Sequence, residues 1–176
     1  LASGMMGVNA FNQPNVQKSK EEIVSVLNEY LTFGKSPDLG AEGSFQSLMH
    51  MSSGGEYLAI MVYLEQTTKL DRTLDAFRKN ITDKYGIATT VGYGPRFLHS
   101  TGQLHKGGPE SGLYLQLVSR SPQDVDIPGK GYGFGAVARS QSVGDFRHLR
   151  SLGRHTVRVE VSQGGSETIL DGNSYK

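Results

Sequence analysis

The chain of 176 residues contains no cysteine and no tryptophan. Without thiols it can form no disulfide, no cysteine-based zinc site and no thiolate nucleophile. Neither sign of charge is in excess, because 18 basic residues stand against 17 acidic ones. That balance argues against a nucleic-acid groove, which usually needs a large basic excess. The absence of cysteine also suits a reducing cytosol, so we expect a cytoplasmic protein.

Long hydrophobic runs are missing as well. The longest apolar run is the segment 57–64, far short of the roughly 20 residues that a membrane-spanning helix needs, so we expect no membrane partner. The first residues lack a basic region and their apolar part is short and broken by glycine, so we do not expect them to be a signal peptide. The chain starts without methionine and runs directly into a dense motif, and we expect a piece of a longer protein.

Helical and strand patterns alternate along the chain. They predict helices at 14–33, 44–51, 68–85 and 136–152, and strands at 57–64, 88–92, 113–117 and 157–161. Such alternation is typical of an α/β fold, and we expect a three-layer sandwich with a mainly parallel sheet. We divide the chain into a terminal helix with its linker at 1–40, an α/β domain at 41–165 and a polar tail at 166–176.

Three local expectations follow from the pattern. The helix at 136–152 is expected to break at Gly144 and Asp145, where Asp145 would cap a second segment. His148, near the end of that helix, is expected on a solvated face. The strand at 113–117 alternates leucine with polar or aromatic residues, so it should be half-buried.

The segment 92–109 follows a predicted strand and shows no periodicity, so we expect a long loop. In open α/β sheets, ligands bind just beyond the carboxyl ends of the strands. The segment gathers polar side chains among five glycines: Arg96, His99, Ser100, Thr101, Gln103, His105 and Lys106. Hydroxyls and an amide suit a polyol, and a basic side chain suits a phosphate. The alternative is a solvated glycine-rich loop with ordinary polar residues.

Metal and nucleotide chemistry fit this segment poorly. His99 and His105 are six residues apart with no carboxylate between them, and no third protein ligand is visible, so we expect no metal. The segment also lacks the Gly-Lys-Ser/Thr ending of a phosphate-binding Walker loop. We expect no cofactor.

Lys20 is the unusual residue of the first helix, because it falls on the apolar stripe formed by Val16, Val24, Leu27 and Leu31. In a structural interpretation, its methylene stem packs while its ammonium reaches water. In a functional interpretation, it is a positioned cation or proton donor at the edge of a site. Burial would then lower its pKa and ease proton transfer.

The stretch 12–20, Asn-Gln-Pro-Asn-Val-Gln-Lys-Ser-Lys, resembles the C-terminal signature of phosphoglucose isomerases, Asp-Gln-x-Gly-Val-Glu-x-x-Lys. The resemblance implies that Lys20 takes the place of the family's active-site lysine and Gln13 that of a phosphate-contacting glutamine. This sequence departs from the signature at Asn12, Asn15 and Gln17.

The segment 89–109 is similar, over a long contiguous stretch, to the C-terminal region of the bifunctional transaldolase/phosphoglucose isomerase fusions. Weaker similarity continues at 144–146 and 157–161. The stretch 103–107 also looks like the Gln-Leu-Ile-His-Gln-Gly segment around the ring-opening histidine of ordinary phosphoglucose isomerases. In those enzymes the histidine precedes the lysine signature, whereas here it follows.

The resemblance implies a sugar-isomerase-like fold and the interconversion of glucose 6-phosphate and fructose 6-phosphate through ring opening and an enediolate. Lys20 and His105, with His99 as the alternative histidine, would assist ring opening. Phosphate and sugar hydroxyls would be held by Gln13, Arg96, Ser100, Thr101, Gln103 and Lys106.

The expected partners are the sugar phosphate and the upstream transaldolase and isomerase domains of the same chain, and a homo-oligomer is compatible with the sequence. The proton-transfer glutamate and a Ser-Gly-x-Ser phosphate loop are not found in the sequence. We therefore expect little activity from this piece alone. The rival interpretation is a non-catalytic sugar-phosphate-binding regulatory domain or a dimerisation domain.

Overall fold

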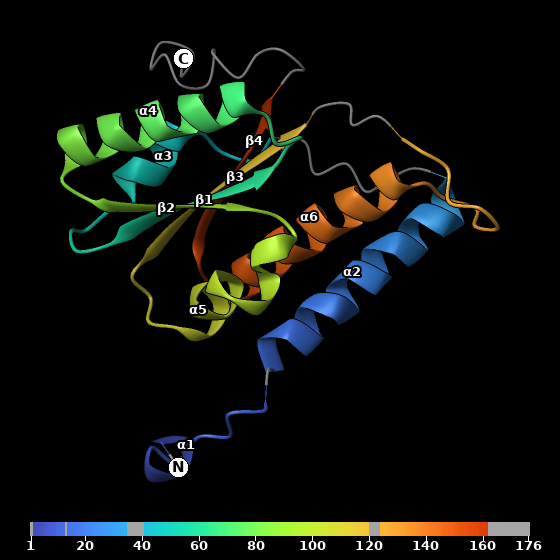
Figure 1. Cartoon of the computed structure of the whole chain (residues 1–176), viewed down its shortest axis with the longest axis horizontal. Coiled ribbons are helices and arrows are strands. Elements are labelled where there is room, and N and C mark those ends of the chain that lie inside the picture. Colours follow the sequence, from blue (N-terminus) through green and yellow to red (C-terminus); the bar gives the residue numbers. More distant parts are fainter. Residues whose placement is uncertain (1, 13, 35–40, 120–123, 162–176) are drawn as a thin grey trace.

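A computed structural model describes residues 2–12, 14–34, 41–119 and 124–161 (Figure 1). Its centre is a four-stranded parallel sheet with the strand order β2-β1-β3-β4. The strands are β1 (Tyr57–Tyr63), β2 (Ala88–Tyr93), β3 (Gly112–Ser119) and β4 (His155–Val161). The predicted α/β sandwich with a parallel sheet is therefore confirmed.

All the described helices except the first, which lies apart, form layers on the two sides of the sheet (Figure 1). They are α1 (Ala2–Met5), α2 (Pro14–Phe33), α3 (Phe45–His50), α4 (Thr68–Tyr85), the 3-10 helix η1 (Arg96–His99), α5 (Thr101–Gly107) and α6 (Phe134–Ser151). Helices α3 and α4 cover one face, and α5 and α6 cover the other. Helix α2 lies outside α6 and adds a further layer there. Among the described residues, no helix combines the length and apolarity needed to cross a bilayer.

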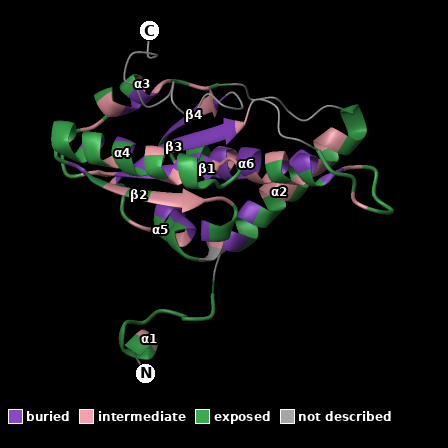
Figure 2. Ribbon diagram, turned by 45° about the horizontal axis from the view of Figure 1, so that its top comes forward, coloured by how far each residue is buried: buried purple, intermediate pink, exposed green. Residues whose placement is uncertain are grey.

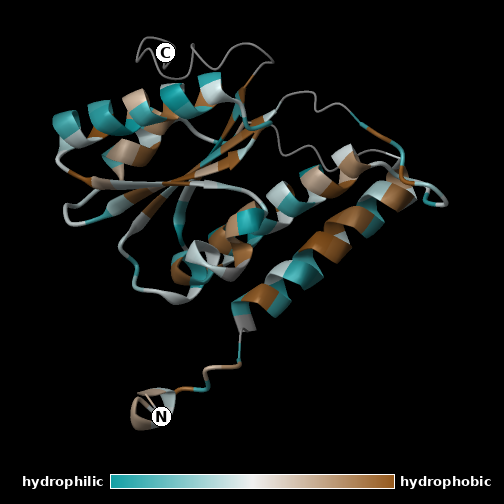
Figure 3. Cartoon of the chain, viewed as in Figure 1, coloured by the Kyte–Doolittle hydropathy of each residue, from teal (hydrophilic) through white to brown (hydrophobic). Residues whose placement is uncertain are grey.

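The two faces of the sheet differ in chemistry. The face under α3 and α4, here called the apolar face, carries Leu58, Ile60, Leu115 and Val157, all almost fully buried. Phe77 of α4 packs into the same core. The buried residues of α4 are Leu70, Leu74, Phe77 and Ile81, and hydrophilic residues alternate with hydrophobic ones along this helix (Figure 3).

The other face, here called the polar face, carries Tyr57, Tyr63, Tyr114, Gln116 and Arg158. Gln116 is completely buried, and its Nε2 donates to the Ser142 carbonyl of α6 at 2.9 Å. Arg158 is also buried and donates to the Gln116 side-chain oxygen. Because both sides of β3 are covered, the expected half-buried strand is instead fully buried (Figure 2).

Local sequence explains the ends of the long helices. Helix α2 starts at Pro14 and ends before Gly34, as predicted, because proline suits the first helical turn and glycine adopts the left-handed cap at φ 68°. Helix α4 ends in the same way at Gly86, also at φ 68°. Its N-cap is Thr67, whose hydroxyl accepts from the Leu70 amide at 3.1 Å.

Three further expectations of the sequence were wrong. The segment 92–109 is not a plain loop, because it contains η1 and α5. Helix α6 runs without a break through Gly144 and Asp145, and Asp145 is buried instead of capping a segment. His148 is also fully buried rather than solvated, because α2 covers that side of α6.

Candidate functional site

The site is built where the short helix α5 lies against the polar face of the sheet. Gly102 allows this helix to fold closely over η1, since a Cβ there would lie 3.0 Å from the Phe97 carbonyl oxygen. The consecutive residues His105 and Lys106 then both point inward, and each is 4% exposed. The predicted loop would have exposed both side chains at the surface, whereas the structure buries them.

Lys106 reaches a carboxylate inside the protein. Its ammonium forms a hydrogen-bonded ion pair with Asp145 of α6, and both side chains are at most 3% exposed. The hydroxyl of Tyr63, the last residue of β1, donates to the other Asp145 oxygen at 3.2 Å. Burial and the Asp145 carboxylate raise the pKa of Tyr63 well above its ordinary value, which keeps the phenol protonated.

His105 sits in an aromatic cage. The rings of Tyr114, Phe97 and Tyr57 lie 5.2, 6.0 and 6.3 Å from its ring, measured between centroids. Both ring nitrogens are buried and have no hydrogen-bond partner among the described residues. Burial lowers the pKa of His105 to about 4, so the imidazole is neutral at pH 7. Lys106 lowers the pKa further, while Asp145 opposes that effect.

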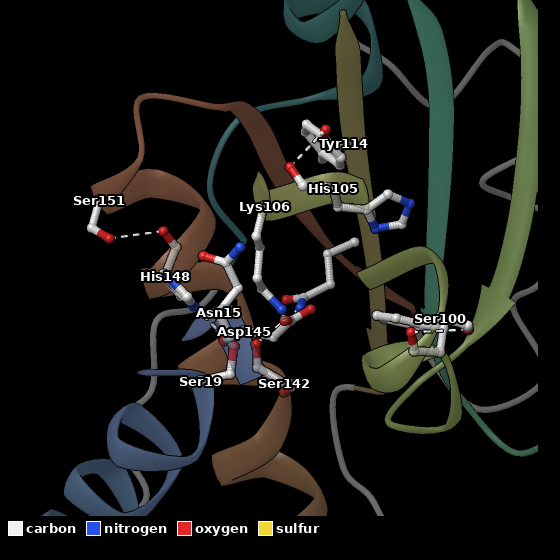
Figure 4. A network of polar contacts seen from close by, with 12 residues as sticks. Asn15, Ser19, Ser100, His105, Lys106, Tyr114, Ser142, Asp145, His148 and Ser151 are labelled. Carbon is white, nitrogen blue, oxygen red and sulfur yellow. Dashed lines mark hydrogen bonds and ion pairs between the residues drawn. The ribbon is translucent and has the colours of Figure 1, made fainter. Parts of the chain in front are cut away.

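A second buried histidine ties α2 to α6. The Nδ1 atom of His148 lies 2.9 Å from the Ser19 hydroxyl oxygen, and that hydroxyl donates to the Asn15 carbonyl at 2.8 Å. Both side chains are 0% exposed. Burial lowers the pKa of His148 to about 4, and the charges of Lys106 and Lys18 lower it further. Figure 4 shows these side chains converging from α2, α5 and α6.

The first turns of α2 also meet the end of α5. A Cβ on Gly107 would lie 2.6 Å from the Asn15 side-chain nitrogen, so a larger residue there would displace the Asn15 amide. Gly144 plays the same part on α6, where a Cβ would lie 3.0 Å from the Ile23 backbone nitrogen. The two stretches that carry the resemblance, 12–20 and 89–109, are therefore in contact in the fold.

Lys20 lies on the exposed flank of α2 rather than on its buried face. Within the described part of the chain, its ammonium has no hydrogen-bond or ion-pair partner. The buried face of α2 is formed by Val16, Ser19 and Val26, whereas Val24 is 56% exposed. The apolar stripe and the buried face differ because Ser19 turns inward to meet His148.

The remaining predicted residues lie at several places. Arg96 is exposed after β2, and its guanidinium donates to the Gln66 side-chain oxygen at 3.0 Å. Ser100 and Thr101 are exposed between η1 and α5, and Gln103 is partly buried. Gln13 and the side chain of His99 lie outside the described residues. Among the residues that the structure describes, no three His, Asp or Glu side chains come together to hold a metal ion.

The sequence prediction missed four residues of the buried cluster: Ser19, Tyr63, Asp145 and His148. Asp145 and His148 are three residues apart on one helix, a spacing that places them on the same face. From the sequence alone, that spacing could have indicated that the two side chains form a polar pair. No comparable signal marks Ser19, because its partner lies 129 residues away in the sequence.

Comparison with known proteins supports the fold alone. A scan against protein-family models finds no match, and a search of curated proteins finds none. One solved structure with a similar fold is the hypothetical protein TT0462 from Thermus thermophilus, with a TM-score of 0.58 and 17% sequence identity. The match covers 84% of this chain and 37% of that protein, so this chain spans just over a third of its length. This is an α/β protein with a parallel sheet sandwiched between helices.

Proposed function

We propose that this chain is the C-terminal part of a sugar-phosphate isomerase that interconverts glucose 6-phosphate and fructose 6-phosphate. The whole protein would be a cytoplasmic transaldolase fusion, in keeping with the resemblance at 89–109. The fold is compatible with this proposal, because sugar phosphates are bound by many α/β proteins at the carboxyl ends of parallel strands.

One observation carries the proposal. The stretch that resembles the lysine signature and the stretch that resembles the histidine segment are far apart in the sequence, yet they touch where Asn15 meets Gly107. Two chance resemblances would have no reason to lie side by side. Ser19, inside the first stretch, also reaches the α6 helix that holds Lys106 in place.

Ring opening requires an acid for the ring oxygen and a base for the anomeric hydroxyl. The exposed ammonium of Lys20 can supply positive charge as oxyanion character develops. The imidazole of His105 is neutral but only 4% exposed, so in this proposal it accepts the hydroxyl proton after α5 moves to uncover it. His99 remains the alternative histidine. The transfer of a proton between C1 and C2 needs a further carboxylate, which we assign to the upstream part of the protein.

Phosphate and sugar hydroxyls would be held by the exposed groups that follow β2, namely Arg96, Ser100 and Thr101, together with Gln103 and Gln13. Lys106 is a different case. Its ammonium is neutralised by Asp145 within the protein. We therefore propose that Arg96 neutralises the phosphate and that Lys106 holds α5 against the polar face of the sheet.

The test is a coupled assay of fructose 6-phosphate isomerisation in the longer protein and in this chain alone. We expect the longer protein to be active and the chain alone to be nearly inactive. Lys20→Ala and His105→Ala should each lower kcat by about 100-fold or more, the usual contribution of a proton-transfer group. Lys18→Ala is the matched control, because Lys18 is an exposed lysine on the same helix. Full activity in both test variants would refute the proposal.

A non-catalytic sugar-phosphate-binding or dimerisation domain is the second candidate. It is favoured by the apolar flank of α2, where Val24 is 56%, Leu31 49% and Phe33 75% exposed. This candidate predicts unchanged isomerase activity in Lys20→Ala and His105→Ala. As a dimerisation domain, it also predicts a sedimentation mass that rises with concentration and returns to the monomer value in Leu31→Glu.

A further inference from the structure

Helix α2 is attached to the rest of the molecule by an unusually polar seam. Its buried contacts with α6 are the Ser19–His148 hydrogen bond and the close approach of Ile23 to Gly144. Further along, Glu29 accepts two hydrogen bonds from the Arg147 guanidinium, at 2.8 and 3.2 Å. The buried hydrophobic side chains of α2 are Val16 and Val26, and Ser19 between them is buried and polar. The middle of the seam therefore includes a buried hydrogen bond to an imidazole.

The hydrogen bonds around His148 indicate which form that is. The Ser19 hydroxyl donates its proton to the Asn15 carbonyl, so the Ser19 oxygen accepts from Nδ1–H of His148. The other ring nitrogen, Nε2, then carries the lone pair. It is buried and has no hydrogen-bond partner among the described residues. A proton added at Nε2 would be a buried donor with no acceptor in this arrangement.

The charges around His148 also oppose its protonation. Lys106 of α5 and Lys18 of α2 are both positive and both act against an imidazolium. Asp145 of α6 acts in favour of one, but it is already bound to Lys106 and Tyr63. Moving α2 away would hydrate the ring and relieve both penalties.

We propose that the seam between α2 and α6 is a proton-sensitive latch, which releases α2 when His148 takes up a proton while the sheet and its apolar face stay folded. Release of α2 uncovers Ser19 and the His148 side of the Lys106–Asp145 pair. This inference is independent of the isomerase proposal, because it concerns only contacts within the described chain.

The size of the effect follows from linkage. The pKa of His148 is about 4 when α2 is docked and near the ordinary 6.5 when the ring is hydrated. Docking is therefore unaffected above pH 6.5 and weakens as the pH falls from 6.5 to 4. At pH 5 the docking equilibrium should fall roughly 30-fold. Glu29 keeps its charge at pH 5, because Arg147 holds the pKa of its carboxyl below the usual range.

Hydrogen exchange measured by mass spectrometry tests the latch at pH 7.5 and pH 5.0. Protection of α2 amides should be lower than that of β1 amides at both pH values, and, after correction for the intrinsic exchange rate, should fall roughly 30-fold from pH 7.5 to pH 5.0. His148→Gln, which keeps a hydrogen-bonding group but cannot be protonated, should remove this response. His105→Gln is the matched control, because it removes the other buried histidine and should leave the response of α2 intact.

Two further measurements keep the inference testable if His148→Gln does not fold. Ser19→Ala should lower α2 protection already at pH 7.5. An NMR titration of the unmodified chain should show the His148 ring titrating in the same pH range in which α2 is released. The latch is refuted if α2 protection does not change with pH, if α2 and β1 amides show the same protection and so open in one step, or if His148→Gln still responds to acid as the unmodified chain does.

Discussion

The two faces of the sheet achieve burial by different means. The apolar face packs leucine, isoleucine and valine against Phe77 and the rest of α4. The polar face buries an ion pair, two histidines and the Gln116–Arg158 pair beneath three helices. Apolar packing contributes roughly 25 cal/mol per Å² and is insensitive to pH. A buried ion pair adds little net stability, because desolvation offsets its attraction.

This difference indicates that the two faces have different roles. The apolar face holds the fold together, whereas the polar face maintains a costly arrangement of charges that an apolar core would not need. Such an arrangement is typical of sites that bind or react, although ion pairs can also serve structure alone. The predictions below test whether the two faces behave as differently as their chemistry suggests.

The largest effect is expected from breaking the ion pair of the polar face. Lys106→Met leaves the Asp145 carboxylate buried without its cation, and we expect a loss of about 3–5 kcal/mol in the free energy of unfolding. The double variant Lys106→Met with Asp145→Leu should recover most of this loss. Urea denaturation measures both variants. An equal loss in the single and double variants would show that packing, not charge, dominates here.

A cavity in the apolar face should act without regard to pH. Leu115→Ala removes a fully buried side chain, and we expect a loss of about 3 kcal/mol. Because the buried residues of that core, within the described ranges, include no histidine and no carboxylate, the loss should be the same at pH 7.5 and pH 5. A loss that changes with pH would mean that the two faces are not independent.

His105 should make the polar face sensitive to acid. Its pKa in the folded chain is about 4, below the ordinary 6.5, so the unfolded chain takes up the proton first as the pH falls. The contribution of neutral His105 to the free energy of unfolding is therefore fully present above pH 6.5 and is lost as the pH falls from 6.5 to 4. At pH 5 the loss should be about 2 kcal/mol. His105→Phe should remove this part of the pH dependence, as followed by denaturation at several pH values.

The smallest effect on stability is expected at Lys20. Because this residue is exposed on α2, Lys20→Ala should change the unfolding free energy by no more than about 0.5 kcal/mol. Thermal denaturation of this variant and of Lys18→Ala provides the comparison. A large loss would give Lys20 a structural role and would complicate any effect on isomerisation.

Much of the fold could be predicted from the sequence, and the reasons are local. Pro14 and Gly34 mark the ends of α2, and Gly86 marks the end of α4, because proline and glycine have backbone preferences that do not depend on the rest of the chain. The run 57–64 predicted the central strand because it is apolar on both sides.

The candidate site was harder to predict, because its contacts are not local. Helix α5 has seven residues, two of them glycine, so it shows no periodicity to recognise. His148 and Asp145 look like ordinary polar residues of a helix until α2 and α5 cover them. The exposure of Lys20 follows from the inward turn of Ser19, which is decided by a partner 129 residues away.

The position of α2 has a consequence for how the chain is made. Helix α2 packs on α6, so Ser19 can contact His148 only after 129 further residues have been synthesised. Helix α2 is thus synthesised before the sheet and α6 but is among the last of these elements to reach its place, since contacts so distant in sequence form slowly. Until then its inward-facing Val16 and Val26 stay uncovered, and the nascent chain has an apolar helix that chaperones can recognise.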